Sequence, residues 1–275
     1  LFLSINSFNL KKKSKVLVSP ITFFSSVYTI MMNDLYPDFC DINLENYNID
    51  LNKLETKIKK DKNIKALIVV DYAGHPANWK SLNFLKKKYK LKLINDNCHA
   101  IGAKLNGDIG YASKYADLVT HSYHPVKNIT TGEGGSILTN NFNLENKIKL
   151  FRNHGIVRNN NLSKKKGLWY HDVDDFGFNF RMTEIQSALG ISQLKKLDSF
   201  IKKRQNIALK YNKKFMDVSL IRSPIVKKNI YHAYHLYPVL IDFEKANISK
   251  KEFFVRMLKK GIMLQSHYIP IYRQN

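Results

Sequence analysis

The sequence predicts an α/β fold with a largely parallel sheet, on the basis of three observations. Short apolar runs recur along the first half of the chain, at residues 16–18, 66–71, 91–95, 118–122 and 136–139. The runs are continuously apolar rather than alternating, which is typical of strands covered on both faces. Helical patterns lie between them, at residues 52–60, 79–89 and 144–152. Because strands and helices alternate, successive parallel strands with helical crossovers are expected.

Composition excludes several classes of protein. The 275 residues are 44% hydrophobic and 12% aromatic, which excludes a disordered or fibrous chain. No window approaches the roughly 18 unbroken apolar residues of a membrane span. Cys40 and Cys98 are the only cysteines, too few for a disulfide framework or a four-cysteine zinc site. We therefore expect a cytoplasmic protein with no metal and no membrane partner.

The net charge of +23 comes from 45 Lys and Arg against 22 Asp and Glu. Such an excess can indicate nucleic-acid binding. Here the lysines are spread along the chain in pairs and triplets, as at residues 11–13, 86–88 and 164–166. Several lie on the polar side of amphipathic stretches, where a solvated face explains them. We expect no nucleic-acid partner.

The middle of the chain predicts a loop and then a long helix. Residues 157–175 are polar, and we expect a mobile loop or a lid there. Thr183 and Gln186 have the spacing of a capping box at the start of a helix. Gly190 is expected to interrupt that helix early.

The end of the chain predicts a strand at residues 235–241, a helix, and a last strand near Met263. Ser249 and Glu252 indicate a second capping box, and Gly261 the helix end.

We place a domain boundary near residue 200. It separates a large domain, residues 1–200, from a small C-terminal domain, residues 201–275. The chain starts at Leu1 rather than Met, and it ends in IPIYRQN without a natural stop pattern. We therefore expect both domains to be truncated.

The stretch from residue 121 to residue 135, HSYHPVKNITTGEGG, holds a candidate catalytic lysine. Lys127 follows an apolar strand and a proline, and Gly132, Gly134 and Gly135 come after it. Glycines permit a close approach of the backbone to a ligand. A desolvated lysine is a neutral amine that can form a Schiff base with an aldehyde. The alternative is an ordinary surface lysine in a turn.

A second element, LKLINDNCHA, places Asp96 at the end of a predicted strand, with His99 following. Ligands of open α/β sheets gather at that edge. A carboxylate there can keep a pyridinium nitrogen protonated. Alternatively, Asp96 is a cap and His99 an ordinary buried histidine. An Asp at one strand end and a Lys roughly thirty residues later together have the layout of a pyridoxal phosphate enzyme.

Four motifs carry a family resemblance: HPVKNITTGEGG, DNCHA, DYAGH and GFNFRMTEIQSALG. With them, the sequence resembles the DegT/DnrJ/StrS sugar aminotransferases over most of its length. The resemblance implies a fold type I large domain like that of aspartate aminotransferase, a smaller α+β C-terminal domain and pyridoxal 5′-phosphate. SALGISQLKKLDSFIKKR and HYIPIYRQ are similar to members that aminate a UDP-linked 4-keto-6-deoxy-N-acetyl sugar for pseudaminic acid and surface polysaccharide synthesis.

The resemblance also implies roles for the cofactor-binding residues. Lys127 would form the Schiff base and Asp96 would pair with the ring nitrogen. His99 would lie by the phenolic oxygen, and Phe23 would stack on the ring. Ser122 would bind the cofactor phosphate.

Further residues are implied to act between subunits or on substrate. Asn179 would reach the cofactor phosphate of a neighbouring subunit, which implies a homodimer with shared active sites. Arg181, His267 and Tyr268 are implied substrate contacts. The substrates would be a UDP-sugar and L-glutamate, the amino donor.

The sequence departs from the family pattern at two places. A Gly-Thr/Ser-x-Ala helix start that binds the cofactor phosphate does not occur in this chain, and position 95 is Asn where the family often has an acid. Lys127 argues against the family dehydratases, which have His there. An aminotransferase for another nucleotide keto-sugar, or a non-catalytic regulator on the same fold, stays an alternative.

Overall fold

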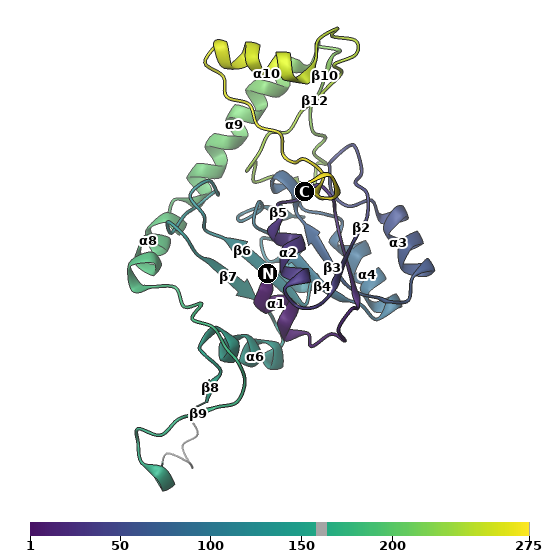
Figure 1. The fold of residues 1–275 in the computed structure, drawn as a ribbon. Helices are drawn as coiled ribbons and strands as arrows, with labels where there is room; N and C mark the ends of the chain where they lie inside the picture. Colours follow the sequence, from purple (N-terminus) through teal and green to yellow (C-terminus); the bar gives the residue numbers. More distant parts are fainter. Residues whose placement is uncertain (158–163, 275) are drawn as a thin grey trace.

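A computed structural model describes residues 1–157 and 164–274, and its centre is one sheet (Figure 1). Within these residues the main sheet has six strands in the order β2-β1-β3-β4-β6-β7. The strands are β1 (Lys15–Val18), β2 (Tyr36–Phe39), β3 (Ile64–Val70), β4 (Lys92–Asp96), β6 (Leu118–Ser122) and β7 (Gly135–Leu138). All neighbours pair in parallel except β6 and β7. The predicted α/β fold with a mostly parallel sheet is confirmed.

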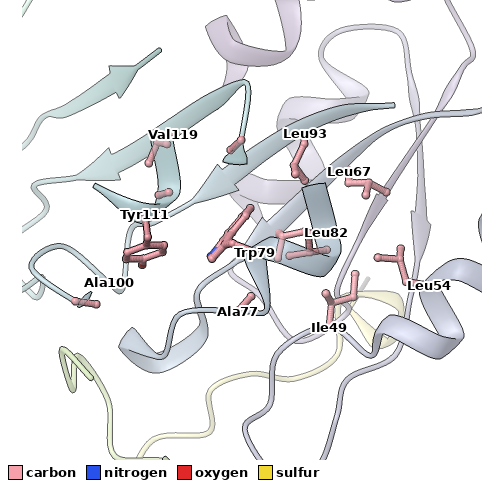
Figure 2. Packing of buried hydrophobic residues seen from close by; sticks show 14 of the residues in the cluster. Ile49, Leu54, Leu67, Ala77, Trp79, Leu82, Leu93, Ala100, Tyr111 and Val119 are labelled. Atoms are coloured by element: carbon pink, nitrogen blue, oxygen red, sulfur yellow. The ribbon is translucent and has the colours of Figure 1, made fainter. Parts of the chain in front are cut away.

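Helices cover both faces of this sheet, as continuously apolar strands require. Apolar side chains of one face pack with α1 (Phe2–Ser7), α2 (Ser25–Met31) and α6 (Phe142–Arg152). Those of the other face pack with α3 (Leu51–Lys60), α4 (Trp79–Tyr89), α5 (Tyr111–Tyr115) and the start of α9 (Leu197–Phe215). Figure 2 shows Trp79 and Leu82 of α4 close to Leu93 of β4 in this second cluster.

Asp and Asn side chains cap the N-termini of two helices beside the sheet. Asp50 accepts from the amides of Asn52 and Lys53 at the start of α3, and Asn78 caps α4. Such side chains satisfy amides that have no partner within the helix. At α8 (Glu184–Leu194), both halves of the predicted capping box of Thr183 are present.

Strand β2 was not expected from the sequence. It contains Pro37 and Asp38 and pairs only with β1, at the edge of the sheet. Proline cannot donate to a ladder, so edge positions are where a strand tolerates it.

The predicted interruption at Gly190 is wrong. Gly190 lies inside α8, and the break comes after Leu194, before α9. A Cβ at position 190 would come within 2.9 Å of Cγ2 of Thr131. The glycine therefore permits close packing rather than a bend.

The tail differs from its prediction in three respects. Instead of a strand over residues 235–241, only β12 (Leu240–Ile241) forms, paired with β10 (Ile221–Arg222). Near Met263 the described chain has no strand.

At α10 (Lys250–Lys259), Ser249 accepts from the amide of Glu252, but the reciprocal half of the predicted capping box is missing. Gly261 does end this helix. Its amide donates to Leu258 O, and the amide of Ile262 donates to Met257 O, the bonding pattern of a Schellman motif.

Helix α9 runs unbroken through residue 200, so the domain boundary stays a prediction. Its far end leads to α10, β10 and β12 (Figure 1). Ile230–Tyr231 (β11) returns to pair with Lys104–Leu105 (β5). None of the helices in the described ranges is both long and apolar enough to cross a membrane.

The predicted loop at residues 157–175 lies partly outside the described residues, which omit 158–163. Its ends are held together by antiparallel pairing of β8 (Ile156–Val157) with β9 (Asp172–Val173). β8 and β9 project from the body of the molecule (Figure 1). A mobile loop or lid stays a prediction.

Candidate active site

Polar residues gather at the carboxyl edge of the parallel sheet. Asp71 directly follows β3, Asp96 ends β4 and Ser122 ends β6. Asp96 lies opposite Val70 on one side and Thr120 on the other. Parallel strands place their carboxyl ends at one edge, where ligands of this fold class bind.

The carboxylate of Asp96 is buried and fixed by two donors. Ser26, on α2, donates from Oγ to Oδ2 at 2.9 Å, and the amide of Cys98 donates to Oδ1 at 3.3 Å. Thr22 and Ser26 share a further hydrogen bond of 2.9 Å. Asp96 is therefore held in one orientation, as a partner for a ring nitrogen must be.

His99 is buried in the turn after β4 with both ring nitrogens engaged. Nδ1 accepts from the amide of Ala73 at 3.2 Å, and Nε2 lies 3.1 Å from the hydroxyl of Tyr268. Burial lowers the pKa of His99 well below its usual value, and the neighbouring His235 and Lys127 add to the shift. The ring is therefore neutral, with its proton on Nε2 directed at Tyr268.

Lys127 lies in the loop after β6, in the same cluster. Burial lowers the pKa of its amine below the usual value, and Cys98 and Asp96 oppose this by favouring the ammonium. The amine makes no hydrogen bond to the described residues. A lysine attacks an aldehyde as the neutral amine, the form that burial favours.

Phe23 precedes α2 and Ser122 ends β6, and their roles with a ring and a phosphate stay predictions. Phe23 is 47% exposed, and its ring centroid lies 6.3 Å from that of Tyr268. Ser122 accepts from the amide of His124 at 3.3 Å. An unpartnered amine, a fixed carboxylate and an exposed aromatic face fit the aldehyde, ring nitrogen and ring of pyridoxal phosphate.

The structure brings His267 and Tyr268 to the same site from the end of the chain. Tyr72 donates from its hydroxyl to the carbonyl oxygen of His267, and Tyr268 contacts His99. A cleft of about 630 Å³ adjoins them, lined mainly by apolar and aromatic side chains. The charge of Lys127 acts on His267, whereas Tyr268 contacts His99.

Asn179 and Arg181 lie elsewhere. Asn179 forms a bridge with Asn153 after α6, and Arg181 donates to Oδ1 of Asn153 at 2.8 Å. Arg181 lines a separate cavity of about 1210 Å³ between β6, β7 and α6. Lys127 is not among the residues that line this cavity. Within one chain, the structure therefore does not bring Asn179 and Arg181 close to Lys127.

The sequence assigned no role to Asp71, the first residue of the DYAGH motif. Its carboxylate is completely buried and accepts five hydrogen bonds, from Ala77 N, Trp79 Nε1, Asn95 Nδ2, Asn97 Nδ2 and Tyr111 OH. Burial raises the pKa of Asp71 to about 6, although four of these donors, those of Tyr111, Ala77, Asn95 and Trp79, oppose the shift. Because Asn95 and Asn97 flank Asp96, Asp71 braces the strand end that carries it.

His235 and Ser26 were also missed. The centroid of the His235 ring lies 4.4 Å from that of His99. The histidine-rich HAYHLYP stretch at residues 232–238 was the available signal, but no spacing rule connects it to β4.

Comparisons with known proteins show the family of the chain. The model of the DegT/DnrJ/EryC1/StrS aminotransferase family matches residues 1–275. UDP-4-amino-4,6-dideoxy-N-acetyl-beta-L-altrosamine transaminase of Campylobacter jejuni is 40% identical over 94% of this chain and 66% of its own length. The enzyme of that name from Helicobacter pylori is 36% identical, over 95% and 66%.

Among solved structures, Helicobacter pylori PseC, an aminotransferase of pseudoaminic acid biosynthesis, superposes with a TM-score of 0.89 at 33% identity. The superposition includes 100% of this chain and 71% of the PseC chain. The fold type I architecture is confirmed, and the chain spans about two thirds of the length of the relatives it matches.

Proposed function

Because the chain belongs to the DegT/DnrJ/EryC1/StrS aminotransferase family, we propose that it aminates a UDP-linked 4-keto-6-deoxy-N-acetylhexosamine with L-glutamate as donor. The family and its named members identify the reaction class as pyridoxal phosphate-dependent transamination of nucleotide sugars. The observation that carries the proposal is the amine of Lys127, unpaired within residues 1–157 and 164–274, in one cluster with the fixed carboxylate of Asp96.

The chain's own residues supply proton transfer and orientation. When bound, pyridoxal phosphate supplies the aldehyde that takes up the amino group and a ring that withdraws electrons from the donor's Cα. The amine of Lys127 is the base that removes the proton from that Cα. The carboxylate of Asp96 keeps a proton on the ring nitrogen, and Ser26 holds this carboxylate in place. His99, neutral and fixed at both nitrogens, donates no proton in this step.

The relatives support the substrate. The Campylobacter and Helicobacter transaminases at 36–40% identity are named for a UDP-linked amino sugar, and PseC is named for pseudoaminic acid. We propose the same class of substrate here, on the route to a surface polysaccharide. GDP-perosamine synthase of Escherichia coli is also 30% identical over 87% of the chain. Another nucleotide keto-sugar is therefore the alternative.

A homodimer is part of the proposal, and helix α8 supports it. No residue of α8 is buried, although Ile185, Leu189, Ile191 and Leu194 lie on it. An apolar surface of this kind is typical of an interface between subunits. Asn179, just before α8, would then face a neighbouring subunit. We also propose a cytoplasmic location, which fits two free cysteines.

The test uses the full-length protein with pyridoxal phosphate, glutamate and a panel of UDP-, dTDP- and GDP-linked 4-keto sugars. Mass spectrometry should find amination of the UDP-linked N-acetyl sugar ahead of the others. Faster amination of a sugar linked to another nucleotide would contradict the proposed substrate but not the proposed transamination. No aminated product with any sugar, and no visible absorbance of a lysine-linked cofactor, would favour the non-catalytic alternative.

A further inference from the structure

A chain of hydrogen bonds passes through His121 and connects three neighbouring strands. Nε2 of His121 lies 3.1 Å from Oδ1 of Asn97, and its Nδ1 lies 3.3 Å from Oγ of Ser136. Oγ of Ser136 in turn lies 2.7 Å from the hydroxyl of Tyr123. Asn97 directly follows β4, Tyr123 directly follows β6, and Ser136 belongs to β7. These side chains therefore join the strand ends at the edge where the candidate active site lies.

Asp71 fixes which atom donates in each of these bonds. Its carboxylate accepts from Nδ2 of Asn97 at 2.9 Å, so Oδ1 of Asn97 faces His121 as an acceptor. Nε2 of His121 must therefore carry the proton, and Nδ1 accepts from the hydroxyl of Ser136. Since Ser136 has only one proton to donate, the hydroxyl of Tyr123 donates to its oxygen.

His121 donates at one nitrogen and accepts at the other only as a neutral imidazole. Burial lowers its pKa to about 4, and the charge of Asp96 opposes the shift. The ring is therefore neutral at neutral pH, with one N–H and one lone pair. Both are used, so the imidazole connects its two neighbours in one fixed orientation.

His121 and Ser122 lie on opposite faces of the sheet. Successive side chains of a strand point to opposite faces. Val119 of β6 packs in the cluster that contains α4, and His121, two residues further, shares its face. Leu118 packs in the cluster that contains α2, so Ser122 lies on that other face. His121 therefore acts on Ser122 through the backbone that the two residues share.

Ser122 depends on this backbone more than Asp96 does. The carboxylate of Asp96 has two donors, the hydroxyl of Ser26 and the amide of Cys98. Within the part of the chain that the structure describes, the hydroxyl of Ser122 has one hydrogen bond, which it accepts from the amide of His124 at 3.3 Å. The end of β6 therefore sets the position of this hydroxyl.

We propose that His121 is a positioning residue for Ser122. Its ring ties the end of β6 to Asn97 at the end of β4 and to Ser136 of β7. The hydroxyl of Ser122 is thereby held ready to donate to the phosphate of the cofactor. This inference rests on the proposed function, in which Ser122 binds that phosphate.

The first test compares pyridoxal phosphate with pyridoxal, which lacks the phosphate. Absorbance titration of the full-length protein, freed of cofactor, gives both dissociation constants. His121→Phe keeps a ring and removes both nitrogens, so the dissociation constant of pyridoxal phosphate should rise about threefold to tenfold, and that of pyridoxal by less than about twofold. His121→Gln, whose amide supplies a donor and an acceptor, should restore most of the preference for the phosphate. An equal change for both ligands, or none, would overturn the proposal.

Ser136→Ala removes the hydroxyl that His121 and Tyr123 share, and Ser113→Ala is its matched control. The hydroxyl of Ser113 donates to the carbonyl oxygen of Gly110, outside this chain of hydrogen bonds. Ser136→Ala should reduce the preference for pyridoxal phosphate about twofold to fivefold, and Ser113→Ala should leave it unchanged. The same preference in both variants would contradict the proposal.

Ser122→Ala separates this inference from the proposed function. If Ser122→Ala loses the preference for pyridoxal phosphate while His121→Phe keeps it, the inference is wrong and the role of Ser122 stands. If the wild type prefers pyridoxal phosphate but aminates no sugar nucleotide, the proposed function falls. A loss of that preference in His121→Phe would then still support the inference.

A measurement without cofactor checks the direction of the bonds. In protein with 15N-labelled histidine, the 15N shifts report which ring nitrogen carries the proton. We expect the Nε2–H form at His121, with a shift of its Nδ1 signal in Ser136→Ala, where the donor is lost. An Nδ1–H form, or an Nδ1 signal that Ser136→Ala leaves unmoved, would overturn the proposal even if His121→Phe failed to fold.

Discussion

The carboxyl edge of the sheet and helix α8 place their side chains in opposite environments. At the edge, the charged groups of Asp71 and Asp96 are buried and given hydrogen-bond donors. On α8, apolar side chains face solvent: Ile185 is 85% exposed and Ile191 61%. A buried carboxylate is stable only when hydrogen-bond donors surround it. A large apolar surface left in water is unfavourable, so it indicates that another molecule covers it.

The difference teaches which parts of the site a single chain provides. Asn95 and Asn97 each donate to the carboxylate of Asp71, so hydrogen bonds within one chain hold both sequence neighbours of Asp96. The face of α8 has no such internal solution. The carboxylates at the edge are thus held by donors of the same chain, while the proposed subunit contact depends on a second molecule.

Among substitutions at the carboxyl edge of the sheet, Lys127→Ala should reduce turnover the most. Without the amine there is neither attacking group nor base, so turnover of the full-length enzyme should fall at least about a thousandfold. The visible absorbance of the lysine-linked cofactor should vanish as well, in a scan of protein mixed with pyridoxal phosphate. Normal transamination by this variant would remove Lys127 from the mechanism.

Asp71→Ala should be the most destabilising change at the edge. It leaves five buried donors without their acceptor, including Trp79 Nε1 and Tyr111 OH. Leaving buried donors unpaired costs about 1–3 kcal/mol each, and we expect a total loss of at least about 3 kcal/mol. Denaturant unfolding measures it.

Tyr111→Phe, which removes one of the five donors, serves as the smaller matched change. If Asp71→Ala lost less than this variant, the bracing role of Asp71 would be untenable.

Asp96→Ala should affect rate more than folding. Asp96 has only two protein donors, so fewer partners are left unpaired, but the ring loses its proton-holding group. We expect turnover to fall about a hundredfold while some cofactor still binds. Stopped-flow absorbance with glutamate alone isolates the first half of the reaction, and an unchanged rate there would contradict the electronic role.

The pH dependence of stability separates Asp71 from other carboxylates. Burial raises its pKa from 3.8 to about 6 in the folded chain. Between these values the folded state binds a proton that the unfolded state releases, so unfolding free energy should decrease as pH rises through this window.

Asp71→Asn cannot titrate and should lose less stability from pH 4 to 6 than the wild type, whatever its absolute stability. Parallel pH curves of the two proteins would show that Asp71 does not titrate there.

The smallest effect on the monomer fold is expected at α8. Ile185→Lys changes a side chain that touches little within the chain, so monomer stability should change by less than about 0.5 kcal/mol. A dimer that covers this face should dissociate, as light scattering would detect. Ser192→Lys, also on α8, tests whether added charge alone is enough. An unchanged dimer in Ile185→Lys would place the interface elsewhere.

Local patterns predicted the elements whose causes are local. Five of the six strands of the sheet, the helices α3, α4 and α6, and the Thr183 cap depend on apolar periodicity and on groups a few residues apart. Gly190 and β2 were mispredicted or missed because distant contacts decide them. Thr131 approaches Gly190, and β1 provides the pairing edge for a strand that contains Pro37.

The sequence by itself determined the α/β class, the family, and the positions of Lys127 and Asp96 relative to the strands, because each is written in periodicity or in a contiguous motif. Only the tertiary structure decided that Asp71 braces Asp96 and that His235, over one hundred residues beyond Lys127, joins the same cluster. Hydrogen bonds and burial at a sheet edge depend on which strand ends and loops meet there, and no spacing along the chain encodes that meeting.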